Sequence, residues 1–460
     1  MSRKKKYIEI SERKLILRSL DVIVVVLSMY LASLYFDFTY INIHSELIYQ
    51  WFIVLSIYFL LIGEVFQMYN LDVSNNQFLI VRSIFISTFV TTLFYIFSPY
   101  ITPSLPENRA QIIGFFFLMT IPIVVWRLLY LWLFFSPKYY KSIIVIGHSS
   151  NSENLINLIK KKNFHNVAAY VSEKKIGDFD NYYNIDKVNL IDLISVTGVT
   201  EIIVSTKEFS EDVILRLNNR FIQLFGEGIN IKGFEKYYEE VTNSVPKEYL
   251  NSDFYKNLNF SKNNEHRLYF FISRFLDLIS AFLGLLMFLI FLPLIIIGNL
   301  FGNRGPLFYS HDRVGKEGKI FKILKLRSMV TDAEKGEAIW ALKNDSRITS
   351  FGKFLRKTRL DEVPQFYNIL KGEMSLIGPR PERPEFVSKL EIEIPFYAIR
   401  HVVKPGLTGW AQVCYPYANT MKEQERKLRY DLFYIKEKDL YLDFKILIKT
   451  ISTVLFFRGQ

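Results

Sequence analysis

The sequence is almost free of cysteine, because Cys414 is the only one in 460 residues. A disulfide framework is therefore excluded, and the chain is compatible with a reducing, cytosolic environment. Cys414 could in principle act as a nucleophile. No chemistry is indicated around it, so we expect a thiol that belongs to the protein core or to an interface.

Histidine is also scarce. The six histidines are scattered, and they form neither an HExxH motif nor a cluster with cysteine. Zinc sites of the usual composition need such ligands at close spacing. The sequence therefore does not indicate a zinc protein.

The composition does not suit a single soluble globule. Half of the residues are hydrophobic and 41 are Phe, yet the formal net charge is +12. This combination is typical of a chain divided between lipid and a basic, water-facing surface, with room for two or three domains. The positive charge predicts anionic partners, and we expect membrane lipids and phosphates rather than nucleic acid.

Four apolar runs fill the N-terminal part of the chain. They cover about 19–36, 47–66, 79–97 and 112–135. Each is long enough to cross a hydrocarbon core of roughly 30 Å as a helix. We therefore expect residues 1–138 to form a bundle of four transmembrane helices.

The orientation of this bundle follows from its lysines and arginines. The chain begins with the basic run 3–6, followed by Arg13, Lys14 and Arg18, whereas the loop 37–46 contains neither Lys nor Arg. Basic flanks of membrane spans stay on the cytoplasmic side. Four crossings then leave everything after residue 136 in the cytoplasm.

A fifth apolar run, 275–301, is interrupted by Pro293. Both of its flanks are rich in Lys and Arg, which places both ends on the same side of the membrane. Proline removes a backbone donor and can break a helix. We predict that 251–302 contains a re-entrant membrane helix broken near Pro293; the alternative is a plain fifth span, which would export the C-terminal part.

Residues 139–250 alternate between strand and helix patterns. Strands are expected at 142–147, 167–171 and 201–205, and helices at 153–162 and 211–225, which predicts a small parallel sheet of Rossmann type. The turn after the first strand has only Gly147 of the glycines in the G-x-G-x-x-G fingerprint. We therefore favour a regulatory or scaffolding domain over a cofactor site, and a homodimer through this domain is a hypothesis.

The last part of the chain, 303–460, contains neighbouring acids beside a proline, Asp361-Glu362-Val363-Pro364. Thr358 and Asp361 have the spacing of a capping box, and Gly372 would end the helix. A helix N-terminus attracts phosphate, and adjacent residues point about 100° apart. One acid could then attack a phosphorus while the other holds a divalent ion.

Rigid, basic loops accompany these acids. Gly378-Pro379-Arg380-Pro381 would present one guanidinium with little freedom lost on binding, and 404–413 is a second glycine-punctuated loop with Lys404 and Trp410. Further cationic candidates are Arg347, Arg356 and Lys357. Together these features indicate phosphate chemistry at a membrane surface.

Six motifs, in order from about 267 to the C-terminus, resemble the bacterial sugar transferases, the polyprenyl-phosphate hexose-1-phosphate transferases. The motifs are Phe308-Tyr309, Arg313-Val314-Gly315 with Gly318-Lys319, Lys325-Leu326-Arg327-Ser328-Met329, Leu360-Asp361-Glu362-Val363-Pro364-Gln365, Met374-Ser375-Leu376-Ile377-Gly378-Pro379-Arg380-Pro381 and the loop 404–413. The four leading spans and the Rossmann-like domain are similar to the long form of that family.

The resemblance implies a transfer of hexose 1-phosphate from a UDP-sugar to undecaprenyl phosphate, with release of UMP, as the first membrane step of capsule, exopolysaccharide or O-antigen synthesis. By it, Asp361 is the nucleophile of a covalent intermediate, Glu362 assists with Mg²⁺ at the pair, and Arg380 holds phosphate. Arg327 joins the substrate-binding candidates. UDP-glucose and UDP-galactose are the favoured donors, with an N-acetylhexosamine left open.

The chain departs from the family pattern at Leu292, Leu326 and Arg359, none of which is a proposed catalytic group. Two other classes stay open. An NAD-dependent sugar dehydratase or epimerase would need the glycine fingerprint that is missing here. A non-enzymatic scaffold or sensor of an assembly complex would make the two acids structural.

Overall fold

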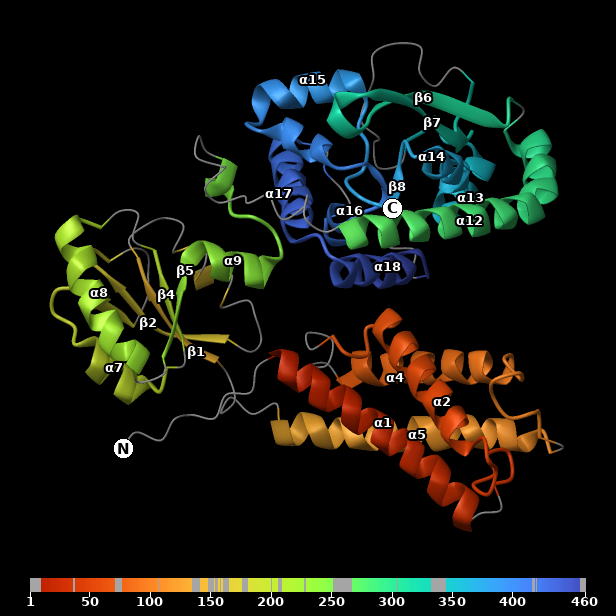
Figure 1. Ribbon diagram of the computed structural model, residues 1–460, viewed down its shortest axis with the longest axis horizontal. Helices are drawn as coiled ribbons and strands as arrows, with labels where there is room; N and C mark the ends of the chain where they lie inside the picture. Colours follow the sequence, from red (N-terminus) through yellow and green to blue (C-terminus); the bar gives the residue numbers. More distant parts are fainter. Residues whose placement is uncertain are drawn as a thin grey trace. The chain divides into compact units, whose positions relative to one another are not determined.

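The computed structural model describes residues 10–35, 38–70, 77–106, 108–134, 141–147, 165–175, 181–199, 201–205, 209–226, 229–250, 267–303, 305–331, 345–415 and 420–455, with single residues 153, 156, 157, 159 and 418. The chain divides into two compact units, Met1–Tyr237 and Tyr238–Gln460. Figure 1 shows the helices and strands of both.

The first unit begins with four long apolar helices, α1 (Ile10–Tyr35), α2 (Ile48–Val65), α4 (Gln77–Ile96) and α5 (Ala110–Phe134). α1 packs against α5, and α4 packs against both α2 and α5. They share a core that includes Phe59, Tyr95 and Phe115, whereas many apolar side chains on their outer faces are exposed. All four are long and apolar enough to cross a membrane, as the sequence predicted, and an apolar exterior suits lipid. The bundle's orientation stays a prediction.

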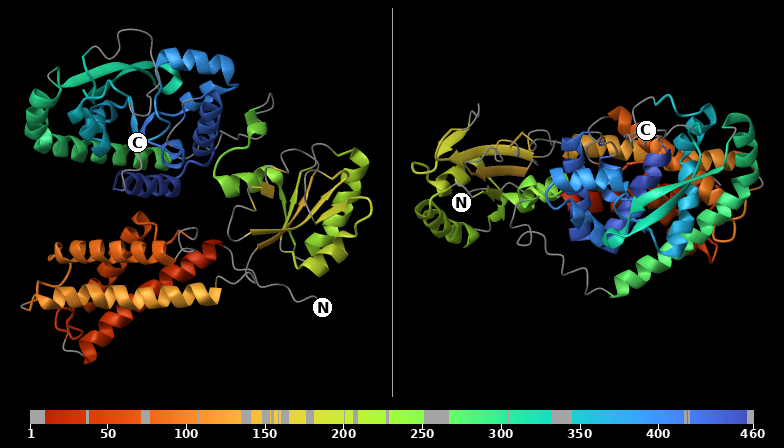
Figure 2. Two further views of the ribbon diagram at one scale, coloured as in Figure 1. Left: turned by 180° about the vertical axis from the view of Figure 1, so that it is seen from behind. Right: turned by 90° about the horizontal axis from the view of Figure 1, so that it is seen from above.

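The first unit continues with a five-stranded parallel sheet in the order β3-β2-β1-β4-β5. Its strands are β1 (Lys141–Ile146), β2 (His165–Ser172), β3 (Tyr182–Asn184), β4 (Glu201–Val204) and β5 (Asn230–Gly233). Helices α7 (Leu190–Thr197) and α8 (Glu211–Gly226) cover one face and share its core (Figure 2).

This sheet confirms the predicted parallel arrangement of Rossmann type, in which α7 joins β3 to β4 and α8 joins β4 to β5. The turn 148–152 and most of the predicted helix 153–162 lie outside the described residues. The preference for a regulatory or scaffolding role over a cofactor site therefore stays a prediction.

The fifth apolar run forms α12 (Arg267–Gly302), one helix that includes Pro293. The helix is therefore continuous through Pro293 and not divided in two, and α12 changes direction in its C-terminal part (Figures 1 and 2). A proline can bend a helix without ending it. The helix is long and apolar enough to cross a membrane, and its re-entrant course stays a prediction.

One face of α12 packs against the rest of its unit. The buried residues recur at intervals of three, four or seven, the spacing of one helical face: Asp277, Ala281, Gly284, Phe288 and Ile295. The opposite face is apolar and exposed, with Phe282 at 67% and Leu289 at 61% of full exposure. This asymmetry suits a helix that contacts lipid on one side and protein on the other.

The remainder of the second unit is helical with small sheets. An antiparallel hairpin joins β6 (Phe308–Val314) to β7 (Ile320–Leu326), and β8 (Ser375–Ile377) pairs in parallel with β9 (Gly406–Thr408). Helix α14 contacts both β7 and α12 (Figure 1). The other elements are α9 (Phe234–Thr242, which starts in the first unit), η2 (Lys247–Leu250), η3 (Lys316–Gly318), α13 (Ser350–Thr358), η4 (Leu360–Gln365), α14 (Phe366–Lys371), α15 (Pro384–Glu393), η5 (Tyr397–Val402), α16 (Trp410–Cys414), α17 (Met421–Glu437) and α18 (Leu440–Leu455).

Candidate active site

The two neighbouring acids lie on η4, a short 3-10 segment between α13 and α14. The capping-box prediction for Thr358 is wrong, because this residue is the last of α13 and its hydroxyl donates to the Phe354 carbonyl at 2.9 Å. Arg359, at φ 60°, ends α13 and turns the chain into η4. Gly372, at φ 84°, ends α14 as predicted.

Asp361 and Glu362 are both buried, each at 8% of full exposure. Val363 on the same segment packs into the core that includes Phe288 of α12 and Leu326 of β7. The acids are therefore carried by a segment that is anchored on its apolar side. Two carboxyl groups in such a place need partners, since burial alone disfavours their charged forms.

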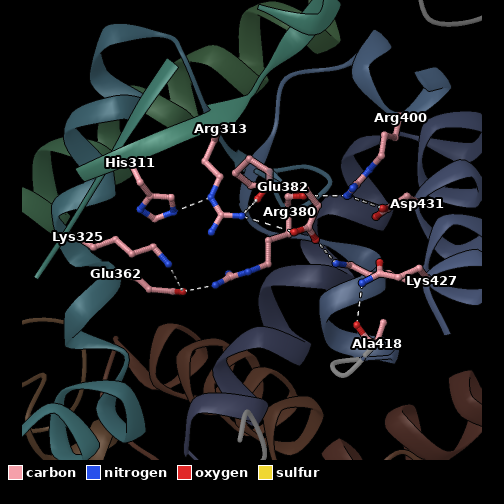
Figure 3. A network of polar contacts seen from close by, with 12 residues as sticks. His311, Arg313, Lys325, Glu362, Arg380, Glu382, Arg400, Ala418, Lys427 and Asp431 are labelled. Carbon is pink, nitrogen blue, oxygen red and sulfur yellow. Dashed lines mark hydrogen bonds and ion pairs between the residues drawn. The ribbon is translucent and has the colours of Figure 1, made fainter. Parts of the chain in front are cut away.

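Glu362 is surrounded by cations. It forms an ion pair with Arg380, and a carboxylate oxygen lies 3.5 Å from Lys325 Nζ (Figure 3). Its other oxygen lies 3.7 Å from an Arg359 nitrogen. Burial opposes ionisation of Glu362, but Arg380, Lys325 and Arg359 outweigh it and hold its pKa below the usual value. Glu362 is thus a fixed negative charge that organises three cations.

Asp361 behaves differently. Burial first, and then the charge of Glu362, raise the pKa of Asp361 to about 6, against the opposing charges of Lys325, Arg356 and Arg359. Its Oδ1 atom is buried and has no hydrogen-bond donor among the described residues. A buried carboxylate with one open oxygen can attack an electrophile or take a metal ligand position.

Arg380 is held by its backbone as well as by its charge. It follows β8 through Gly378 and Pro379, and its carbonyl accepts a hydrogen bond of 2.8 Å from Arg400 Nη2. A Cβ on Gly378 would clash with the carbonyl oxygen of Lys404, so these two backbone segments approach as closely as glycine allows. The predicted rigid presentation of this arginine agrees with these contacts.

Further charged side chains surround the segment that carries Arg380 (Figure 3). Arg313 donates to His311 Nε2 at 2.8 Å and to the Pro381 carbonyl at 2.9 Å. Lys427 donates to Glu382 at 2.6 Å. Burial, followed by the charge of Arg313, lowers the pKa of His311, so this imidazole is neutral. The motif that contains Arg313 pointed to this region, but no sequence pattern indicated His311.

Two of the predicted cationic residues stand close to η4. Arg356 donates to Ser328 Oγ at 2.9 Å, and its charge stabilises ionised Asp361. Lys357 is exposed near the end of α13. The structure therefore brings Arg356 into the electrostatic surroundings of the acids, together with Lys325 and Arg359, which were not proposed as site residues.

Other predicted residues have different roles. Arg347 forms a two-pronged ion pair with Asp345, with contacts of 2.9 and 2.6 Å. Arg327 donates to the Pro306 carbonyl and lies 5.5 Å from the ring centre of Tyr309. Lys404 lies beside Arg274 of α12, since a Cβ on Gly372 would be 3.5 Å from Lys404 Nζ and 3.6 Å from Arg274 Nη2.

Trp410 is a core residue in this structure. Its side chain is 1% exposed, its indole N–H donates to the Asn243 carbonyl at 2.8 Å, and its ring stacks on Phe433. The structure does not bring it to the acids, and a buried ring has no face left for a substrate. This placement does not favour the predicted contact of Trp410 with substrate, which stays a prediction.

The donor atoms fit Mg²⁺ only in combination with a substrate. No group of three or more His, Cys, Asp or Glu side chains suited to a metal occurs in the described part of the chain. Mg²⁺ commonly uses one or two carboxylates and completes its shell with water and phosphate oxygens. Asp361 has an open oxygen for this purpose, whereas Glu362 is already engaged by Arg380.

Comparisons with known proteins point to one family. A family model described as bacterial sugar transferase matches residues 268–457. The chain is 43% identical over 188 residues to the UDP-N-acetylgalactosamine-undecaprenyl-phosphate N-acetylgalactosaminephosphotransferase of Aeromonas hydrophila, covering 41% of this chain and 44% of that protein. It is 47% identical over 144 residues to a Bacillus subtilis protein named for undecaprenyl-phosphate N-acetylgalactosaminyl 1-phosphate transfer, covering 31% of this chain and 79% of that protein.

A third relative is the UDP-glucose:undecaprenyl-phosphate glucose-1-phosphate transferase of Klebsiella pneumoniae, 42% identical over 151 residues, or 32% of each chain. The similarity thus spans less than half of the Aeromonas and Klebsiella relatives and about four-fifths of the Bacillus one. It falls on the unit that contains Asp361, Glu362 and Arg380.

Proposed function

Because this chain belongs to the bacterial sugar transferase family, we propose that it transfers a sugar 1-phosphate from a UDP-sugar to undecaprenyl phosphate, with Asp361 as the nucleophile. The observation that carries the proposal is the contrast between the two acids. Glu362 is neutralised by Arg380 and Lys325, whereas Asp361 keeps an open, buried oxygen beside these cations.

The reaction would proceed in two displacements. An oxygen of ionised Asp361 attacks the sugar-proximal phosphorus of the UDP-sugar, the bond from that phosphorus to the UMP oxygen breaks, and UMP leaves with the bonding electrons. An oxygen of undecaprenyl phosphate then attacks the same phosphorus and releases Asp361. This scheme predicts ping-pong kinetics, because both phosphate substrates meet one carboxylate in turn.

The surrounding cations would stabilise the charge on the phosphoryl oxygens. Lys325 and Arg356 reduce the repulsion between Asp361 and a diphosphate, and Arg380 shares the carboxylate of Glu362 with Lys325. Mg²⁺, held by Asp361 together with substrate phosphate oxygens, would supply further charge neutralisation. A low-polarity setting strengthens each of these interactions.

The position of the site suits a lipid acceptor. α12 presents an apolar, exposed face, and its buried face packs against the segments that carry the acids. An enzyme that joins a water-soluble donor to a lipid phosphate has to work at the headgroup plane of the membrane. We place the protein in the bacterial inner membrane with this unit on the cytoplasmic side.

The donor class follows from the names of the relatives, which differ among themselves. Proteins named for transfer of N-acetylgalactosamine, glucose and galactose are all similar to this chain. We therefore propose a UDP-hexose or UDP-N-acetylhexosamine as donor and the first membrane step of a capsule, exopolysaccharide or O-antigen as the setting. A donor panel should include UDP-N-acetylgalactosamine beside UDP-glucose and UDP-galactose.

The decisive test is UMP release by the purified full chain with undecaprenyl phosphate and Mg²⁺. We expect Asp361→Asn to lower the rate by about three orders of magnitude, because an amide cannot act as the nucleophile. Asp312→Asn is the matched control, since Asp312 is exposed on β6. Donor with a labelled sugar should leave label on the wild-type protein but not on Asp361→Asn.

Two outcomes would contradict the proposal in different ways. Release from none of the UDP-sugars would favour the scaffold alternative. Release that is unchanged in Asp361→Asn would keep the enzyme but remove Asp361 as its nucleophile.

A further inference from the structure

One turn of α12 contacts two separate backbone segments of the candidate site. Arg274 donates to the carbonyls of Ile369 and Leu370, at 2.8 and 2.9 Å. These carbonyls belong to the last turn of α14, where a helix leaves its acceptors unsatisfied. Because α14 directly follows η4, this contact ties the segment carrying the two acids to the apolar helix.

Asp277, one turn further along α12, makes the second contact. It is 4% exposed, and its Oδ1 accepts hydrogen bonds from Ser375 Oγ at 2.9 Å and from the Leu376 amide at 2.7 Å. Arg274 lies 4.0 Å from its other oxygen. A buried carboxylate is tolerated only where such donors satisfy it, so these bonds fix its place firmly.

The strand held by Asp277 leads straight to the arginine of the site. Ser375 and Leu376 belong to β8, and only Ile377, Gly378 and Pro379 separate them from Arg380. The intervening backbone has little freedom, because β8 pairs with β9 and Pro379 has a fixed φ angle. A displacement of β8 would therefore be passed on to the ion pair between Arg380 and Glu362.

We propose that Asp277 is a positioning residue for the transfer reaction: it fixes β8 against α12 so that Arg380 stays paired with Glu362 next to Asp361. This inference rests on the proposed function. It makes the seating of the apolar helix a determinant of the rate, although Asp277 itself touches no substrate. A purely structural role would instead lower the amount of folded protein and leave the kinetics of the folded fraction unchanged.

The kinetic test is a double-mutant cycle in the full-length protein with UMP release as the readout. We expect Asp277→Ala to lower kcat about 10- to 100-fold, the range of effects produced by small misplacements of a catalytic group. Asp277→Asn keeps an acceptor oxygen for Ser375 and Leu376, so it should retain most of the rate. Ser280→Ala is the matched control, because among the described residues the Ser280 hydroxyl donates to the Asp277 carbonyl within α12.

The double-mutant cycle distinguishes a positioning role of Asp277 from a general loss of structure. If Asp277 acts through Arg380, adding Asp277→Ala to Arg380→Ala should lower kcat by less than about threefold. A fold loss of kcat in the double variant that equals the product of the losses in the two single variants would overturn the proposal. So would an Asp277→Ala protein whose folded fraction has the wild-type kcat.

Hydrogen exchange gives a readout that does not depend on activity. The Leu376 amide donates to Asp277, so residues 374–381 should exchange faster in Asp277→Ala and at the wild-type rate in Ser280→Ala. Unchanged exchange in Asp277→Ala would overturn the positioning role whether or not the wild type is active. An inactive wild type with the expected exchange pattern would instead refute the proposed function while confirming that Asp277 holds β8.

Discussion

Replacing Glu362 by glutamine removes the negative charge that three surrounding cations share, and it leaves the size of the side chain unchanged. At an effective dielectric constant of about 20, a charge pair at the 3.5 Å of Glu362 and Lys325 is worth roughly 5 kcal/mol before desolvation. Arg359 contributes less than its 3.7 Å would indicate, because its side chain is 37% exposed and screened by water. Removing one partner of a buried ion pair lowers the free energy of unfolding by about 3–5 kcal/mol, and we expect the loss in Glu362→Gln to lie near the lower end of this range.

The same substitution should change how the rate depends on pH. In the wild type, burial and the charge of Glu362 raise the pKa of Asp361 to about 6, so the attacking carboxylate is lost as the pH falls through that value. In Glu362→Gln one cause of the raised pKa is gone, while Lys325, Arg356 and Arg359 still favour ionised Asp361. The acid limb of the profile should therefore move to lower pH, although the plateau falls because Arg380 has lost its partner.

The measurement is UMP release at saturating donor between about pH 4.5 and 8, the range around the ordinary and raised carboxyl pKa values, with thermal unfolding of each variant recorded alongside. Glu385→Gln, on an exposed position of α15, is the control for a general effect of the amide. An acid limb that stays in place or moves to higher pH would refute the electrostatic reasoning for this pair.

Three further predictions concern a close backbone contact, the role of Trp410 and the need for a divalent ion. In Gly406→Ala the added Cβ would clash with the backbone of Gly378, so a loss of about 1–3 kcal/mol in unfolding free energy should appear in thermal melts. Trp410→Phe leaves the Asn243 carbonyl without its donor and should lower stability by about 1–3 kcal/mol while kcat/KM stays within about twofold; a larger kinetic loss would restore Trp410 to the substrate site. Removal of divalent ions by EDTA should abolish UMP release, and added Mg²⁺ should restore it for the wild type but not for Asp361→Asn.

The elements could be predicted where their signals are local. Four apolar helices and the parallel sheet follow from runs and alternations that each lie within one continuous stretch of sequence. The helix boundary at Asp361 could not be predicted from the sequence. It depends on Arg359 adopting a left-handed conformation, which is unfavourable for a residue other than glycine. Thr358 therefore ends one helix where its spacing to Asp361 indicated the start of another.

The candidate site shows the same limit at longer range. The acids and Arg380 were found from their motifs, but the pairing of Arg380 with Glu362 is a contact between segments that only the fold brings together. Trp410 was assigned to the substrate because a glycine-rich loop looks alike whether its aromatic ring points inward or outward. Its actual partner, Asn243, lies 167 positions away in the chain.

The glycines around Arg380 limit how this enzyme can be altered. A Cβ on Gly406 or Gly409 would meet the backbone of Gly378, so two main-chain segments are already in contact where the arginine loop begins. The path of that loop has no adjustable part, and no larger residue can be inserted there to move Arg380 inward or outward. A design that aims at a new donor sugar must therefore vary the side chains that border the acids and leave the loop as it is.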